Sequence, residues 1–136
     1  MAKPPRTRAA DNENARTRAQ AAVAYLEVAN LVLDDDSTAM PGVAAGLAVL
    51  AGIAASDAIC ARRLGLIHRG DDHRAASGLL ATATPDGAKL SQVFRRLIDI
   101  KDEAHYGLTL VSSRKARDAV RWAQTLVSRA AEELER

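Results

Sequence analysis

The sequence predicts an all-α protein, an antiparallel bundle of about five helices in a single domain. Apolar residues recur at spacings of three and four over long stretches, strand-like alternation is essentially absent, and the connecting segments are short. The 136 residues fit one domain, and a chain of this length buries roughly two-thirds of its unfolded surface. With 48% hydrophobic and 26% charged residues, the composition argues against global disorder.

The first two helices are the longest and the most apolar. The first is predicted from Asp11, which can cap it, to about Asp34, where a run of three aspartates opposes the helix dipole. The second is predicted over about residues 38–64, with Gly65 placed to end it. Its richness in alanine and glycine allows neighbouring helices to approach closely. We therefore expect the second helix to be the central one.

The second half of the chain predicts three more helices. A short third helix, capped by Asp71 or Asp72, runs to about Thr82. The dipeptide Thr84-Pro85 combines a cap with a proline at the first helical position, which predicts the start of a fourth helix that ends near Gly107. A fifth helix opens at one of the serines at 112 and 113 and carries its own apolar stripe.

Composition and charge exclude several function classes. The aromatic content of 3% argues against a base-stacking platform. The lone Cys60 rules out a disulfide framework and a cysteine-based zinc site, and we predict that it is inert. No glycine-rich phosphate loop or metalloprotease motif is present, so we predict no cofactor and no metal. Residues 1–10 read as a flexible basic tail, which leaves 11–136 as the folded domain.

The sequence shows no secretory signal, and we expect a cytoplasmic protein. One uncharged segment, residues 37–56, has nearly the length of a membrane span. It consists mostly of alanine and glycine, contains Pro41 and is followed at once by Asp57, so a core helix is the better interpretation. We therefore expect no contact with a membrane.

Two charged residues of the fourth helix fall on its apolar face. With Leu90 as origin and about 100° per residue, the apolar side chains lie within about 60° of it. These are Val93, Phe94, Leu97, Ala104 and Leu108. Lys101 falls at about 20° and His105 at about 60°, one turn further on. An unpaired lysine is costly to bury, so we expect a partner in Asp57, the only charged residue between Ser37 and Cys60.

Such a cluster could perform chemistry. A histidine beside a cation has its pKa lowered and is available as a neutral base. With a cation to neutralise a phosphate, this is what metal-independent RNA cleavage requires. In this interpretation His105 is the base, Lys101 the cation and Asp57 the residue that orients Lys101. The alternative is a structural Lys101–Asp57 ion pair with His105 at the surface.

These residues also carry a resemblance. The segment Lys101-Asp102-Glu103-Ala104-His105-Tyr106, followed by a basic helix with alanines at 116, 119 and 123, resembles the C-terminal half of HEPN domains. The alanine-rich second helix with Ser56-Asp57-Ala58-Ile59 is similar as well. The resemblance implies a homodimeric helical bundle in a toxin–antitoxin or defence-type system. Implied partners are RNA, a nucleotide or a minimal nucleotidyltransferase, and Tyr106 fits the family's tyrosine.

The sequence departs from the pattern of catalytic HEPN domains, in which four to six residues separate an arginine from the histidine that follows it. Here those positions hold Ile98, Asp99 and Ile100, and Lys101 precedes His105 with three residues between them. Lysine also lacks the two-pronged geometry with which arginine binds phosphate. Two alternatives therefore stand, a metal-independent RNase and a non-catalytic protein–protein interaction module.

Further basic residues are candidates for binding nucleic acid or another anion. They are Arg95 and Arg96 on the fourth helix, Arg114, Lys115, Arg117 and Arg121 on the fifth, and His68 and Arg69 before the third. Clustered cations of this kind can contact phosphates, and the start of the third helix could hold an anion. Ordinary solvated helix faces carry the same pattern.

Overall fold

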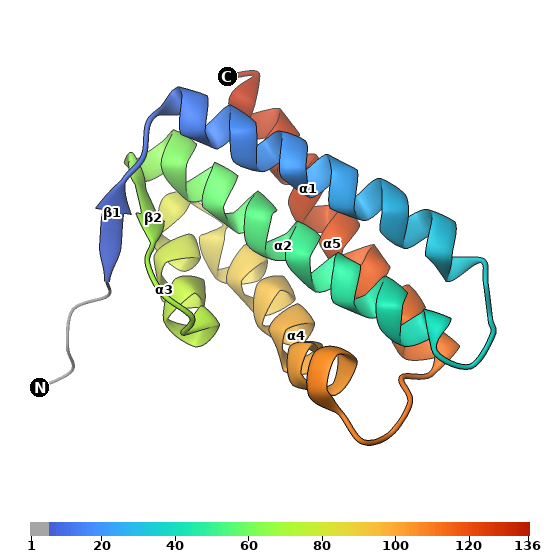
Figure 1. Ribbon diagram of the computed structural model, residues 1–136. Coiled ribbons are helices and arrows are strands. Elements are labelled where there is room, and N and C mark those ends of the chain that lie inside the picture. Colours follow the sequence, from blue (N-terminus) through green and yellow to red (C-terminus); the bar gives the residue numbers. More distant parts are fainter. Residues whose placement is uncertain (1–5) are drawn as a thin grey trace, which may run out of the picture.

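The computed structural model describes residues 6–136 and confirms the all-α bundle (Figure 1). Its helices are α1 (Asn12–Leu33), α2 (Met40–Leu64), α3 (His73–Ala83), α4 (Gly87–Tyr106) and α5 (Ser113–Leu134). Two short strands, β1 (Thr7–Ala9) and β2 (Leu66–His68), form an antiparallel sheet with Arg8 opposite Ile67. The long helices α1, α2, α4 and α5 make the body of the bundle (Figure 1).

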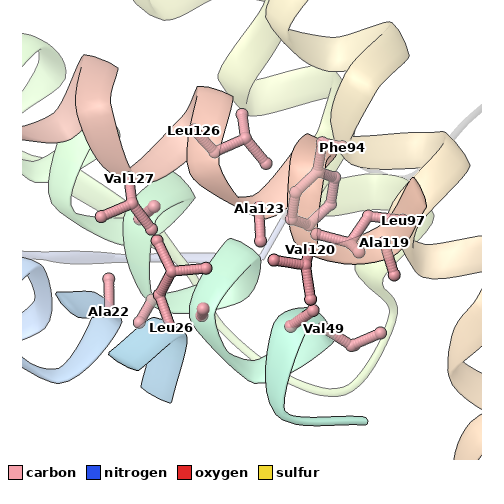
Figure 2. Close-up of a cluster of buried hydrophobic side chains, with 14 of the residues drawn as sticks. Ala22, Leu26, Val49, Phe94, Leu97, Ala119, Val120, Ala123, Leu126 and Val127 are labelled. Carbon is pink, nitrogen blue, oxygen red and sulfur yellow. The ribbon is translucent and has the colours of Figure 1, made fainter. Parts of the chain in front are cut away.

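The alanine-rich helix α2 is the central element, as the sequence predicts. It packs against α1, α4 and α5 (Figure 1), and 15 of its 25 residues are buried. Most of these are alanine or glycine, so the neighbouring helices supply the large side chains. Figure 2 shows Leu26, Val49, Phe94, Leu97 and Leu126 meeting from four helices. The core is therefore built around the small residues of α2, with larger side chains from all four long helices between them.

Capping interactions begin or end the helices close to the residues that the sequence predicts. Asp11 accepts a hydrogen bond from the backbone N–H of Asn14 (2.8 Å), and Asn14 accepts one in return. Gly65 ends α2 in the left-handed conformation at φ 67°, which glycine adopts without strain. The Ser112 hydroxyl accepts a hydrogen bond from the N–H of Lys115 at the start of α5. These caps satisfy backbone groups that the helix leaves unpaired.

The fourth helix begins later than the sequence predicts. Thr84 ends α3, and α4 starts at Gly87 with Asp86 at its N-cap. Thr84 and Pro85 instead form a tight corner, in which the Thr84 hydroxyl donates to Asp86 (2.9 Å). A side chain at Gly87 would collide with the backbone of Ala81. The corner thus needs glycine at the first position of α4, and the start predicted from Thr84-Pro85 was too early by two residues.

The N-terminal strand differs from the expected tail. The Thr7–Ala9 strand pairs with Leu66–His68, a segment predicted to be a plain connector. The pairing continues past the strand, where the N–H of Arg69 donates to the carbonyl of Arg6 (2.8 Å). A three-residue strand without alternation leaves no periodic signal in the sequence. Residues 1–5 of the expected flexible tail lie outside the described residues.

The helix α2 is long and apolar enough to cross a membrane. Most of its apolar window is buried inside the bundle. The central helix of a soluble protein has the same composition, so burial by α1, α4 and α5 accounts for it.

Candidate functional site

Asp57 pairs with a residue other than the predicted one. Its carboxylate accepts a hydrogen bond from the Nε of Arg18 on α1 (3.1 Å), and its side chain is 20% exposed. Burial raises the pKa of Asp57, and the positive charge of Arg18 opposes that effect. Within residues 6–136 no ion pair joins Asp57 to Lys101. The expected Asp57–Lys101 pair is therefore absent, because α1 supplies the long basic side chain that reaches Asp57.

Lys101 faces the α3–α4 side of the bundle. It is half-buried, as its place on the apolar face predicts. It lines a hollow of about 280 Å³ together with Asp71, Asp72, Asp99 and Asp102. Burial lowers the pKa of His73 at the start of α3, and the nearby Lys101 charge lowers it further. The histidine whose pKa responds to the charge of Lys101 is thus His73, the first residue of α3.

His105 lies on the α2 side of the last turn of α4, away from Lys101's hollow. A side chain at Gly46 would place its Cβ 3.0 Å from Cε1 of the His105 ring. The imidazole therefore rests on the glycine of α2, and the missing side chain makes room for it. Tyr106 is 76% exposed and points away from the core. The rings of His105 and Tyr106 are 6.0 Å apart.

An open groove begins at His105. Its volume is about 420 Å³, and it runs between the first half of α2 and the segment that joins α4 to α5. Apolar side chains from both elements line it, and these are Val43, Leu47, Leu50, Leu110 and Val111. Glu103, the only carboxylate in the lining, is held by Lys115 at 3.0 Å. We call this feature the α2–α4 groove.

Exposed apolar side chains surround the α2–α4 groove. Leu108 is fully exposed, and several other apolar residues at this end of the bundle are exposed as well. These are Leu31 at the end of α1, Met40 at the start of α2, and Tyr106 and Leu110 around the end of α4. Exposed apolar side chains next to an open groove are typical of an interaction site or a ligand groove.

Apart from His68, the predicted anion-binding residues are exposed and belong to several elements. Arg95 and Arg96 are exposed on α4. On α5, Arg114 and Arg117 are exposed, while Arg121 pairs with Asp118 at 3.3 Å. Arg69 is exposed beyond β2. Spread over several elements, these cations do not form one phosphate-binding surface.

Two further residues have unusual surroundings. Both ring nitrogens of His68 are buried and have no hydrogen-bond partner within residues 6–136. Cys60 is buried in α2, and burial raises the pKa of its thiol to about 12. Such a thiol is protonated at neutral pH and unreactive, as the sequence predicts. Within residues 6–136 no three His, Cys, Asp or Glu side chains are arranged to hold a metal ion.

A charged cluster that the sequence analysis did not predict lies at the opposite end of the bundle. Glu133 of α5 is 1% exposed. Its carboxylate accepts from the Nε of Arg129 (2.8 Å) and lies 3.4 Å from the Nη1 of Arg63. Arg129 also makes two hydrogen bonds to Asp86, at 2.7 and 2.8 Å. This Glu133 cluster joins the ends of α2 and α5 to the start of α4.

No family model matches the chain, and no curated protein matches it. The chemistry must therefore be inferred from the geometry. The three side chains that were expected to form one cluster lie in three different places. His105 lies in the α2–α4 groove, Lys101 lies beside α3, and Asp57 forms an ion pair with Arg18.

Proposed function

We propose that this chain is a HEPN-like helical protein that acts by binding another protein, with the α2–α4 groove as its binding surface. The observation that carries the proposal is the groove itself. It is open, apolar along both walls and bordered by the fully exposed Leu108. Burying such surface against a partner is the main favourable term in most protein–protein associations.

The charge of the groove selects among the partners that the resemblance implies. RNA binding draws most of its free energy from lysine and arginine side chains on phosphates. The lining of the α2–α4 groove contains neither residue, and its only ionisable side chains are Glu103 and His105. An apolar segment of a partner protein fits this lining, whereas a phosphate backbone does not. Of the implied partners, a minimal nucleotidyltransferase in a toxin–antitoxin or defence-type system is the one we propose.

RNA cleavage is the weaker candidate. A catalytic base needs a cation close to the same phosphate, and Lys101 lines a hollow shared with α3 whereas His105 lies in the groove on the α2 side. Asp57 is engaged by Arg18 and is unavailable to orient Lys101. The residues of the base-and-cation scheme thus lack a common site within one chain.

Co-expression of this chain with a minimal nucleotidyltransferase tests the proposal. We expect the two proteins to purify together, and we expect Val43→Asp and Leu110→Asp to abolish the complex by placing a charge in the apolar lining. The matched control is Gln124→Asp on the exposed face of α5, which should leave the complex intact. Complexes retained by both groove variants would contradict the proposed surface.

Incubation with total RNA in the absence of metal tests the catalytic alternative. We expect the wild type and His105→Ala to leave the RNA equally intact. Cleavage by the wild type that His105→Ala abolishes would overturn the binding-module proposal in favour of an RNase.

A further inference from the structure

A second open hollow lies between α1 and α5, on a different face from the α2–α4 groove. Its volume is about 520 Å³. Small or apolar side chains form its walls, and these are Ala19, Val23 and Ala24 from α1 with Ala131 and Leu134 from α5. Arg16 and Glu27 mark its two ends along α1. We call the α1 residues of this hollow, together with Gln20, the α1 flank.

The two charged residues of the α1 flank are exposed and opposite in sign. Neither Arg16 nor Glu27 has an ion-pair partner within residues 6–136. Eleven residues separate them, which is close to three helical turns and roughly 16 Å along the axis. They therefore project from the same side of α1, with an apolar stretch between them.

We propose that two copies of this chain associate through the α1 flank, with their α1 helices antiparallel about a two-fold axis. The axis passes α1 midway between Arg16 and Glu27. Arg16 of each copy then meets Glu27 of the other, so both ends of the contact are closed by opposite charges. Between them Ala19 faces Ala24 and Gln20 faces Val23 of the second copy.

The order of charges makes the α1 flank complementary to itself. A two-fold interface uses the same patch on both copies, so each residue must suit the residue at the mirrored position. A basic residue at one end, an acidic residue at the other and small residues between them meet this condition. In a parallel arrangement Arg16 would face Arg16 and Glu27 would face Glu27, which like-charge repulsion disfavours.

The size of the α1 flank sets the strength of the association. With 22 residues, α1 is roughly 33 Å long and about 10 Å wide. Even with the neighbouring edge of α5, the contact is smaller than the roughly 800 Å² per partner of a standard stable interface. The dimer is therefore weak, and its population depends on protein concentration.

Charge reversal on the α1 flank tests the proposal, with sedimentation velocity over a range of concentrations as the readout. The wild type should associate reversibly. Arg16→Glu and Glu27→Arg should each weaken the association by about tenfold or more, because both ends of the contact then carry like charges. The double variant Arg16→Glu/Glu27→Arg should restore it. A mixture of the two single variants should also associate, because each supplies the charges that the other needs.

Folding does not confound this test. Glutamate near the start of α1 and arginine near its end both agree with the helix dipole, so each single variant should fold, which circular dichroism checks. Lys89→Glu on α4, which lies across α2 from α1 (Figure 1), is the matched charge reversal and should associate like the wild type.

Several results would overturn the α1 contact. A wild type that is monomeric at every concentration reached would do so, as would single variants that associate as tightly as the wild type. If Val43→Asp abolishes self-association and Arg16→Glu does not, the second copy occupies the α2–α4 groove. The two proposals therefore fail separately, because they rest on different faces.

Discussion

The two ends of the bundle differ in which side chains they bury and which they expose. Where α2 and α5 end and α4 begins, Glu133 is buried and two arginines close around it. Where α4 ends and α2 begins, Leu108 and its apolar neighbours face solvent, and His105 rests in an open groove on Gly46. One end buries charge and the other exposes apolar surface.

This difference separates stability from recognition. The ion pairs around the buried Glu133 hold three helices in one arrangement, because loss of an arginine leaves the buried carboxylate poorly compensated. Exposed apolar side chains contribute little to folding, since they stay in water in both the folded and the unfolded chain. Substitutions at the charged end should therefore change the free energy of unfolding, and those at the open end should change binding.

The largest effect should follow from Arg129→Ala. The substitution removes the partner of Glu133 and the two hydrogen bonds to Asp86, and it leaves a buried carboxylate with Arg63 alone. We expect the free energy of unfolding to fall by about 3 kcal/mol, the lower part of the range for breaking a buried ion pair. Urea unfolding measures it.

The exposed ion pair of Arg121 with Asp118 is the matched control for Arg129→Ala. Arg121→Ala should cost about 0.5 kcal/mol or less, because water screens exposed pairs. Equal losses in the two variants would mean that the Glu133 cluster contributes no more than an ordinary surface pair. The contrast between the two ends would then be lost.

Alanine substitutions at two glycines of α2 compare the packed middle of the bundle with its open end. A side chain at Gly52 would collide with Leu97, which is buried and must shift, and overpacking of this kind costs about 1–3 kcal/mol. At Gly46 the obstacle is the ring of the exposed His105, which can swing away. Alanine is also the better helix former by about 1 kcal/mol. Gly52→Ala should therefore destabilise, and Gly46→Ala should leave stability unchanged or raise it.

Thermal unfolding of Gly52→Ala and Gly46→Ala measures this difference in stability. A loss at Gly46→Ala as large as at Gly52→Ala would show that the His105 ring is held in place. The α2–α4 groove would then be a packed part of the fold, and its accessibility to a partner would be in doubt.

The sequence was a good guide to helices and a poor guide to partners across helices. Caps act within three or four residues, so Asp11, Gly65 and Ser112 could be assigned from their neighbours alone. A helical wheel gives the direction of a side chain and leaves its neighbour undetermined. It placed Lys101 on the inner face correctly, yet which residue reaches Asp57 depends on how α1 and α4 pack around α2.

The Glu133 cluster was missed for the same reason. Arg129 and Glu133 are four residues apart on α5, a spacing that also occurs in countless exposed ion pairs. What buries this pair is the corner between α3 and α4 with Arg63 beyond it, and these are distant in the sequence. A carboxylate next to the apolar stripe of α5 was the only local signal.

Low pH should reduce the stability that the ion pairs at the Glu133 end of the bundle contribute. Hydrogen bonds from Arg129, and next from Thr84, lower the pKa of Asp86. A carboxyl group with a lowered pKa in the folded state stabilises the fold above its ordinary pKa of about 4, and this contribution is lost as the pH falls below it. Because the Asp86 side chain is 44% exposed, we expect at most about 1 kcal/mol.

Urea unfolding at about pH 6 and about pH 3, for the wild type and Asp86→Asn, isolates this contribution. The wild type should lose more stability than the variant over this interval. Asp57 acts in the opposite sense in both proteins, since its raised pKa means that acid relieves the cost of its burial. A pH dependence that is the same in both proteins would assign the acid sensitivity to other carboxylates.

The smallest effect decides between the observed and the expected partner of Asp57. In a double-mutant cycle, Arg18→Ala and Asp57→Ala should be coupled by about 0.5–1 kcal/mol, because the two side chains are hydrogen-bonded and half-buried. Asp57→Ala and Lys101→Ala should be additive to within about 0.3–0.5 kcal/mol. Coupling between Asp57 and Lys101 in place of Arg18 would bring the lysine back to the carboxylate, and with it the base-and-cation arrangement that RNA cleavage needs.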